Sequence, residues 1–224
     1  YELAVIIEDG LRRMYQEGEN KFYYITTMNE NYQQPEMPPG VEEGIVRGMY
    51  SLRRSTRKKG PRVQLMGAGT ILREVEAAAA MLEQDYGVAA DIWSLTSINE
   101  LQREGKGVAR WNLLHPEDAP RMPYITEMLD GHEGPVVIAT DYMKSHAEQL
   151  RQFIPRRYMV LGTDGYGRSD TRERLRRFFE VSREYVVLAA LKALVDEGAL
   201  KPGVVVDAMQ ALGISADKVD PTTI

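Results

Sequence analysis

Three glycines fall within six residues of one segment, Gly162–Asp170 (sequence GTDGYGRSD). The segment follows an apolar stretch and precedes residues with helical spacing, so it reads as a loop between a strand and a helix. Glycines allow unusual backbone dihedrals and close approach by another surface. Such a loop can bind an anion, with Arg168 as a fixed charge and the helix dipole assisting. We favour the alternative, a contact with another domain or subunit.

In this interpretation Tyr166 is the aromatic anchor, and the predicted interface residues are Asp164, Gly165, Tyr166, Gly167 and Arg168. We expect a positive φ at Gly167. Substitution of Gly167 by valine is then expected to hurt assembly more than folding, because a β-branched residue resists that conformation.

A second polar segment, Asn29–Tyr32, follows an expected strand, at the edge where ligands of α/β proteins usually lie. Asn29, Glu30 and Tyr32 are therefore predicted interface residues as well. A polar turn before a linker explains them equally well.

Gly67 and Gly69 stand between a predicted strand and a predicted helix, where a phosphate-binding loop would lie. The dinucleotide fingerprint needs a third glycine at position 72, which is Leu72, although Asp91 falls about where a ribose-binding acid would follow. We favour an ordinary tight turn over nucleotide binding.

The remaining polar residues do not suggest a catalytic or metal site. The three histidines, His115, His132 and His146, lie in separate segments without metal-ligand spacing, and there is no cysteine. Five cations, Arg53, Arg54, Arg57, Lys58 and Lys59, form a cluster that is favoured as a solvated loop over an anion site. We assign no catalytic, cofactor-binding or metal-binding residue.

The composition limits the functional classes. The chain has 224 residues, a net charge of −5, 43% hydrophobic and 27% charged residues, which is typical of a globular domain. The acidic balance argues against nucleic acid or anionic membranes as partners. No apolar stretch reaches the length of a membrane span and no signal peptide is recognisable, so the expected location is the cytoplasm.

The pattern of apolar residues predicts an α/β fold with a mostly parallel sheet covered by helices on both faces. A stub precedes it: a helix over residues 1–16, a strand over Lys21–Thr27, and a linker containing Pro35, Pro38 and Pro39. The expected domains are residues 1–34, the linker 35–44, and an α/β domain over 45–224. Because Tyr1 lies inside a helix, we expect a fragment of a longer polypeptide. The predicted strands after the linker are Val63–Gly67, Asp91–Thr96, Pro135–Thr140 and Tyr158–Thr163. The predicted helices are Glu42–Leu52, Ile71–Asp85, a helix that begins at Ser97, Met143–Ile154, Thr171–Phe179, Arg183–Glu197 and Val204–Leu212. Two of these helices have a predicted capping box, formed by Ser97 with Glu100 and by Asp170 with Glu173.

Blocks along nearly the whole chain carry a family resemblance. They are TTMNENYQQP (26–35), VQLMGAGTILRE (63–74), WSLTSINELQRE (93–104), RWNLLHP (110–116), ATDYM (139–143), FFEV (178–181) and the glycine loop itself. Together they resemble the C-terminal region of the homodimeric pyruvate dehydrogenase decarboxylase component, a thiamine-diphosphate family of the transketolase superfamily.

The resemblance implies that residues 1–34 end an aminopyrimidine-binding middle domain and that residues 45–224 form a transketolase-like C-terminal domain. The whole enzyme would oxidatively decarboxylate pyruvate with thiamine diphosphate and magnesium, and pass the acetyl group to a lipoyl group of the acyltransferase component. Implied partners are the rest of the polypeptide, a second subunit and that component.

The family's GDG…N motif and its catalytic glutamate have no counterpart here, and Thr163-Asp164-Gly165 lacks the first glycine of the motif. We therefore expect this chain alone to be inactive, to bind no cofactor, and to support assembly and active-site shape. The rival hypothesis is a stand-alone module that binds a nucleotide at one of the two glycine loops.

Overall fold

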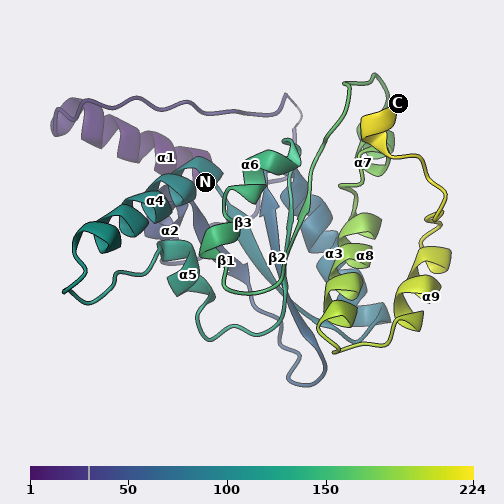
Figure 1. Cartoon of the computed structure of the whole chain (residues 1–224). Coiled ribbons are helices and arrows are strands. Elements are labelled where there is room, and N and C mark those ends of the chain that lie inside the picture. Colours follow the sequence, from purple (N-terminus) through teal and green to yellow (C-terminus); the bar gives the residue numbers. More distant parts are fainter. Residues whose placement is uncertain (30) are drawn as a thin grey trace.

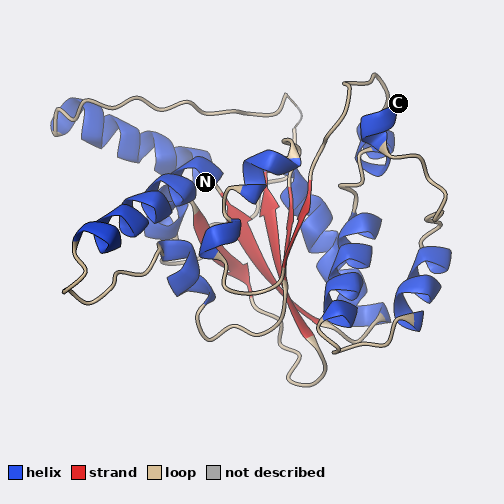
Figure 2. Ribbon diagram, viewed as in Figure 1, coloured by secondary structure: helices blue, strands red, loops and turns tan. Residues whose placement is uncertain are grey.

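The computed structural model describes residues 1–29 and 31–224 and has a five-stranded sheet at its centre (Figures 1 and 2). The strand order is β1-β3-β2-β4-β5. Strands β2, β3, β4 and β5 are parallel to one another, and the edge strand β1 is antiparallel to β3. Leu65 of β2 lies opposite Ile92 of β3 and Val137 of β4. The strands are β1 (Met49–Arg53), β2 (Arg62–Ala68), β3 (Ala89–Leu95), β4 (Val136–Ala139) and β5 (Tyr158–Leu161).

Helices cover both faces of this sheet, as Figure 2 shows. The helices are α1 (Glu2–Leu11), continued by a π-helical turn over Arg12–Gln16, α2 (Glu42–Arg47), α3 (Leu72–Asp85), α4 (Ile98–Leu114), α5 (Tyr124–Leu129), α6 (Lys144–Glu148), α7 (Arg172–Phe178), α8 (Arg183–Asp196) and α9 (Gly203–Ala211). Short 3₁₀ turns span Gly69–Ile71, Arg151–Phe153 and Pro221–Thr223.

Two hydrophobic cores form because the parallel strands are buried on both sides. One core packs α3 and α8 against the sheet around Leu65, Val75 and Leu191. The other packs α4, α5 and α6 around Met66, Trp93 and Ile125. Every residue of β3 is buried, which explains why all but two of its residues, Asp91 and Ser94, are apolar. The predicted fold class is confirmed.

The predicted strands after the linker are all present, and Ser97 caps α4 by accepting a hydrogen bond from the Glu100 amide at 3.1 Å. Other predictions were wrong. Residues Lys21–Thr27 form no strand, because no described strand lies beside them to complete a ladder. The predicted helix Glu42–Leu52 ends at Gly48, whose positive φ stops it, and β1 follows.

Two helix predictions near the carboxyl ends of the strands also need correction. Met143–Ile154 is not one helix: α6 ends at Glu148, and a 3₁₀ turn brings Phe153 into the core. The cap of α7 is Thr171, whose hydroxyl accepts from the Arg174 amide at 3.4 Å. Asp170 lies one residue too early for this role and instead accepts from the Thr171 amide.

Candidate functional site

The loops after β4 and β5 are joined at the carboxyl edge of the sheet. Thr163 donates its amide to the carbonyl of Tyr142 at 2.9 Å and its hydroxyl to the carbonyl of Asp141 at 2.6 Å. The Asp164 carboxylate accepts the Lys144 amide at 2.9 Å. The first residues of the glycine loop are therefore held by hydrogen bonds to the loop after β4, and the Asp164 carboxylate is one of the acceptors.

Gly165, and not Gly167, carries the conformational requirement of the glycine loop. Gly165 has a φ of +111°, and a Cβ there would lie 2.5 Å from the Pro221 carbonyl oxygen. Gly167 does not have a positive φ, and a Cβ on it would meet nothing within 4 Å. The expected positive φ at Gly167 was therefore wrong, and the close approach that glycine permits here is to the chain's own C-terminal segment.

The two largest side chains of this loop differ: Arg168 contacts the chain itself, and Tyr166 is exposed. The Arg168 guanidinium lies 4.4 Å from the centroid of the Phe178 ring, beside a cavity of about 300 Å³ that Arg174 also lines. Tyr166 projects into solvent, with 84% of its surface exposed. An aromatic side chain this exposed is available for another surface, and its role as an anchor stays a prediction.

Asn29 and Tyr32 contact α7 and α3 of the same chain. Arg172 donates to Asn29 at 2.9 Å, Arg176 donates to the Tyr32 hydroxyl at 3.4 Å, and the Arg73 guanidinium lies 4.6 Å from the Tyr32 ring centroid. Glu30 lies outside the described residues. The extended segment after α1 is thus attached to the C-terminal half of the chain at this point.

Glu74, which the sequence analysis did not single out, connects these elements. It is only 5% exposed, and its two oxygens accept from the Arg183 amide at 3.0 Å, from the Arg183 side chain at 2.9 and 3.1 Å, and from Arg176 at 3.2 Å. Burial raises the pKa of Glu74, but the hydrogen bonds and charges of the two arginines outweigh it and hold the pKa below its ordinary value. The one available signal was a carboxylate on the apolar face of a predicted helix.

The first helix is attached through a second carboxylate, that of Glu2. Its Oε1 accepts from the hydroxyls of Tyr50 at 2.7 Å and Ser94 at 2.6 Å, and Tyr1 and Tyr50 share a hydrogen bond of 2.5 Å. Tyr50 and Ser94 are both 2% exposed and lie on β1 and β3. Burial is the main reason that the pKa of Tyr50 is strongly raised. Helix α1 is therefore fixed to the antiparallel edge of the sheet.

The Gly67–Gly69 loop has the contacts of a packing turn. A Cβ on Gly67 would lie 2.6 Å from the Leu72 Cα, so glycine lets the following turn pack against the strand. The Asp141 carboxylate lies 4.0 Å from the Cβ position of Gly69, and a negative charge there opposes a phosphate. These contacts support the tight-turn interpretation.

Asp91 lies near the amino end of β3, away from this loop, so its suggested role as a ribose-binding acid was wrong. It accepts hydrogen bonds from Arg62 at 2.6 Å, Gln64 at 3.0 Å and the Ser55 amide at 2.9 Å. Burial raises the pKa of Asp91, and these donors together bring it below the ordinary value. The residue is a structural carboxylate.

The three histidines remain apart. His115 stacks on Trp111 with ring centroids 4.3 Å apart, and His146 lies beside Tyr142. His132 contacts Trp93 edge-on and lies 3.7 Å from Asp91; burial, followed by the charge of Arg54, lowers its pKa. Within residues 1–29 and 31–224, no group of three histidine or carboxylate side chains is placed to hold a metal ion.

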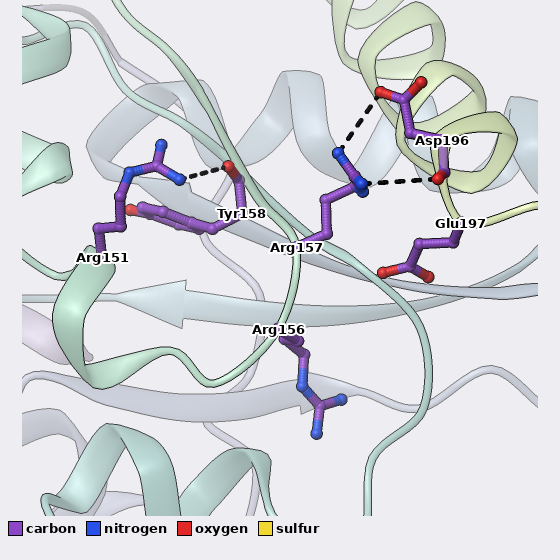
Figure 3. A pocket seen from close by; sticks show the side chains of 6 residues that line it. All are labelled: Arg151, Arg156, Arg157, Tyr158, Asp196 and Glu197. Atoms are coloured by element: carbon purple, nitrogen blue, oxygen red, sulfur yellow. Dashed lines mark hydrogen bonds and ion pairs between the residues drawn. The ribbon is translucent and has the colours of Figure 1, made fainter.

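A shallow cavity of about 480 Å³ opens at the amino end of β5 (Figure 3). Its arginines are already used: Arg157 pairs with Asp196 at 3.6 Å, and Arg151 donates to the Tyr158 carbonyl at 3.0 Å. Figure 3 shows Arg156 pointing away from both. Arg156 donates to the carbonyls of Leu129, His132 and Gly134. The cavity has no arginine free to bind an anion.

Comparison with known proteins gives two matching families. Residues 48–182 match the model of the transketolase-like TK C-terminal domain, and residues 1–35 match that of the pyruvate dehydrogenase E1 component middle domain.

No helix in the described part of the chain combines the length and apolarity needed to cross a membrane.

The similar curated proteins include the pyruvate dehydrogenase E1 components of Pseudomonas aeruginosa and Escherichia coli. They are 56% and 53% identical to this chain over 222 and 223 residues, which is 99% of the chain in each case. The chain spans only 25% of the length of either relative. Among solved structures, transketolase from Leishmania mexicana has a TM-score of 0.46 at 16% identity, over 69% of this chain and 19% of that one.

Proposed function

Because this chain belongs to the transketolase-like TK C-terminal domain family, we propose that it is the C-terminal part of a pyruvate dehydrogenase E1 component. The observation that carries the proposal is the 56% identity over 99% of the chain. The whole protein would oxidatively decarboxylate pyruvate with thiamine diphosphate and magnesium, and would transfer the acetyl group to a lipoyl group of the acyltransferase component. It would do so as a homodimer in the cytoplasm.

We divide the chain into residues 1–34 of the middle domain, a linker over 35–44, and the C-terminal domain over 45–224. The matches to the two family models, which end and begin at residues 35 and 48, support this division. The three attachments described above, at Glu2, Asn29 and Tyr32, would keep the end of the middle domain in a fixed position on the C-terminal domain.

The described residues of this chain offer no site for the metal ion that accompanies thiamine diphosphate. In the described residues no cluster of carboxylates and histidines can hold a metal, and the Asp164 carboxylate is occupied by the Lys144 amide. We therefore assign cofactor binding and catalysis to the portion of the polypeptide that the longer relatives have in addition. This chain would contribute assembly surface, including Tyr166, and the shape of the active site.

The proposal is tested by comparing this chain with the full polypeptide from the same source. The full polypeptide is expected to decarboxylate pyruvate in the presence of thiamine diphosphate and Mg²⁺, measured with an artificial electron acceptor. The isolated chain is expected to show neither turnover nor thiamine diphosphate binding in calorimetry. Turnover by the pure chain, or tight binding of a nucleotide to it, would contradict the proposal and favour the rival module.

A further inference from the structure

The ten residues 53–62 form what we call the basic loop. They contain six cations and no carboxylate, in a chain whose net charge is −5. The loop leaves the edge strand β1 and enters β2 at Arg62. The rest of the chain therefore carries an excess of acid, and positive charge is concentrated at one place on the amino edge of the sheet.

The backbone of the basic loop is held in place at its base. The Ser55 amide and the Arg62 side chain both donate to the buried Asp91 carboxylate, at 2.9 and 2.6 Å. Arg62 also donates to the Arg57 carbonyl at 2.7 Å, and Ala89 donates its amide to the Pro61 carbonyl at 2.8 Å. The cations between these points are therefore presented at a defined position.

Only part of the positive charge is neutralised within the described chain. Arg62 pairs with Asp91, and Arg53 lies 3.6 Å from Glu83. Arg54 donates to the His132 ring at 2.9 Å, an uncharged acceptor while the imidazole is neutral. Arg57, Lys58 and Lys59 are exposed and have no carboxylate within ion-pair distance among the residues that the structure describes.

Protection of the sheet edge explains part of this pattern. Charged residues on an edge strand prevent pairing with another chain, and Arg53 and Arg54 are placed to do so. Arg57, Lys58 and Lys59 lie beyond the end of β1 and do not serve that purpose. Three like charges kept together in a tethered loop repel one another, which a bound anionic surface would relieve.

We infer that the basic loop is a docking surface for a carboxylate-rich segment of a partner protein, with Arg57, Lys58 and Lys59 as its contacts. The patch is small and the molecule is otherwise acidic, so a short acidic segment meets only the loop, whereas a long polyanion also meets the acidic remainder. The choice of a protein partner also rests on the proposed function, in which this chain is part of an assembly of enzymes.

The test measures binding of a fluorescein-labelled oligoglutamate peptide to the full chain by fluorescence anisotropy, at low and physiological salt. In the test variant, Arg57, Lys58 and Lys59 are all changed to Glu. The matched control changes Arg103, Lys106 and Arg110, three exposed cations on α4, to Glu. We expect about tenfold weaker binding for the test variant and near wild-type binding for the control, because only the first removes the contacts.

Equal binding by wild type and test variant, or equal losses in both variants, would overturn the inference. A DNA duplex that binds more tightly than the peptide at physiological salt would replace it with nucleic-acid recognition. If sedimentation shows that the wild type and the control variant are oligomers and that the test variant is a monomer, the partner would be a second copy of the chain. Thermal melting checks that both variants fold. None of these outcomes depends on pyruvate turnover, so failure here is distinct from failure of the proposed function.

Discussion

At the scale of single residues, Glu74 connects α3 to α7 and α8 near the carboxyl edge of the sheet. Its carboxylate holds Arg183 at the start of α8, and through Arg176 it supports the contact to Tyr32. The sequence did not predict this network, because its members are more than 100 positions apart and a carboxylate on an apolar helix face does not reveal its partner. Gly67 was easier to interpret, since Leu72, which packs against it, is close in the sequence, whereas the positive φ expected at Gly167 belongs to Gly165.

We expect Glu74→Ala to lower the free energy of unfolding by about 2 kcal/mol. Loss of one partner of a buried ion pair usually costs more, but Arg183 is 46% exposed and regains water. Glu76→Ala, on the exposed side of the same helix, is the matched control and should change stability little. Urea denaturation of both variants measures the difference.

The same pair of variants has a pH signature. The pKa of Glu74 in the folded state is below its ordinary value of 4.5, so its contribution is present above that pH and is lost as pH falls toward the folded pKa. The stability difference between wild type and Glu74→Ala should therefore shrink below about pH 4.5. A difference that stays constant down to pH 3 would show that Glu74 acts through packing and not through its charge.

At the scale of elements, the four parallel strands were predictable because their apolar runs are short and separated by helices. Strand β1 was not, because antiparallel pairing with β3 leaves no local signal that distinguishes Met49–Arg53 from the end of a helix. Lys21–Thr27 shows the converse. Its aromatic and β-branched residues favour a strand, yet Phe22 and Tyr24 are exposed and no described strand pairs with it.

The glycine loop gives a prediction at this scale. Gly165→Ala should cost roughly 1–3 kcal/mol, because φ is +111° and the new Cβ would collide with the Pro221 carbonyl. Gly167→Ala should be nearly neutral, since that position has neither constraint. Hydrogen exchange should show faster exchange in residues 215–224 for Gly165→Ala only. Equal exchange in the two variants would mean that the contact with the C-terminal segment is unimportant.

At the scale of the whole molecule, α1 and the π-helical turn that continues it present an apolar stripe to solvent. Leu3, Ile7, Leu11 and Tyr15 recur at intervals of four and are 45 to 80% exposed. Figure 1 shows α1 at the periphery of the molecule, and α1 contacts α2. Such a stripe is typical of a helix that packs against further chain, which agrees with the length of the relatives.

We expect the double change Ile7→Gln and Leu11→Gln to leave the stability of this chain within about 0.5 kcal/mol of wild type, because little buried surface is lost. Binding of the dye ANS should fall. In the full-length polypeptide the same change should be strongly destabilising. A similar change at buried Ile125 is the control and should destabilise both proteins. Destabilisation of the isolated chain by the α1 variant would show that the stripe is packed within it.

The placement of α8 late in the chain sets the order in which the molecule can fold during synthesis. The face of the sheet that α3 and α8 cover needs Val186, Leu191 and their neighbours before its core is complete, whereas the opposite face is complete once Tyr158 has been made. More than 100 residues lie between the end of β3 and the end of α8. At a typical rate of translation, their synthesis takes on the order of ten seconds. During that interval α3 can cover part of this face, but the part that α8 packs on is exposed, and this is when a chaperone has the most apolar surface to protect.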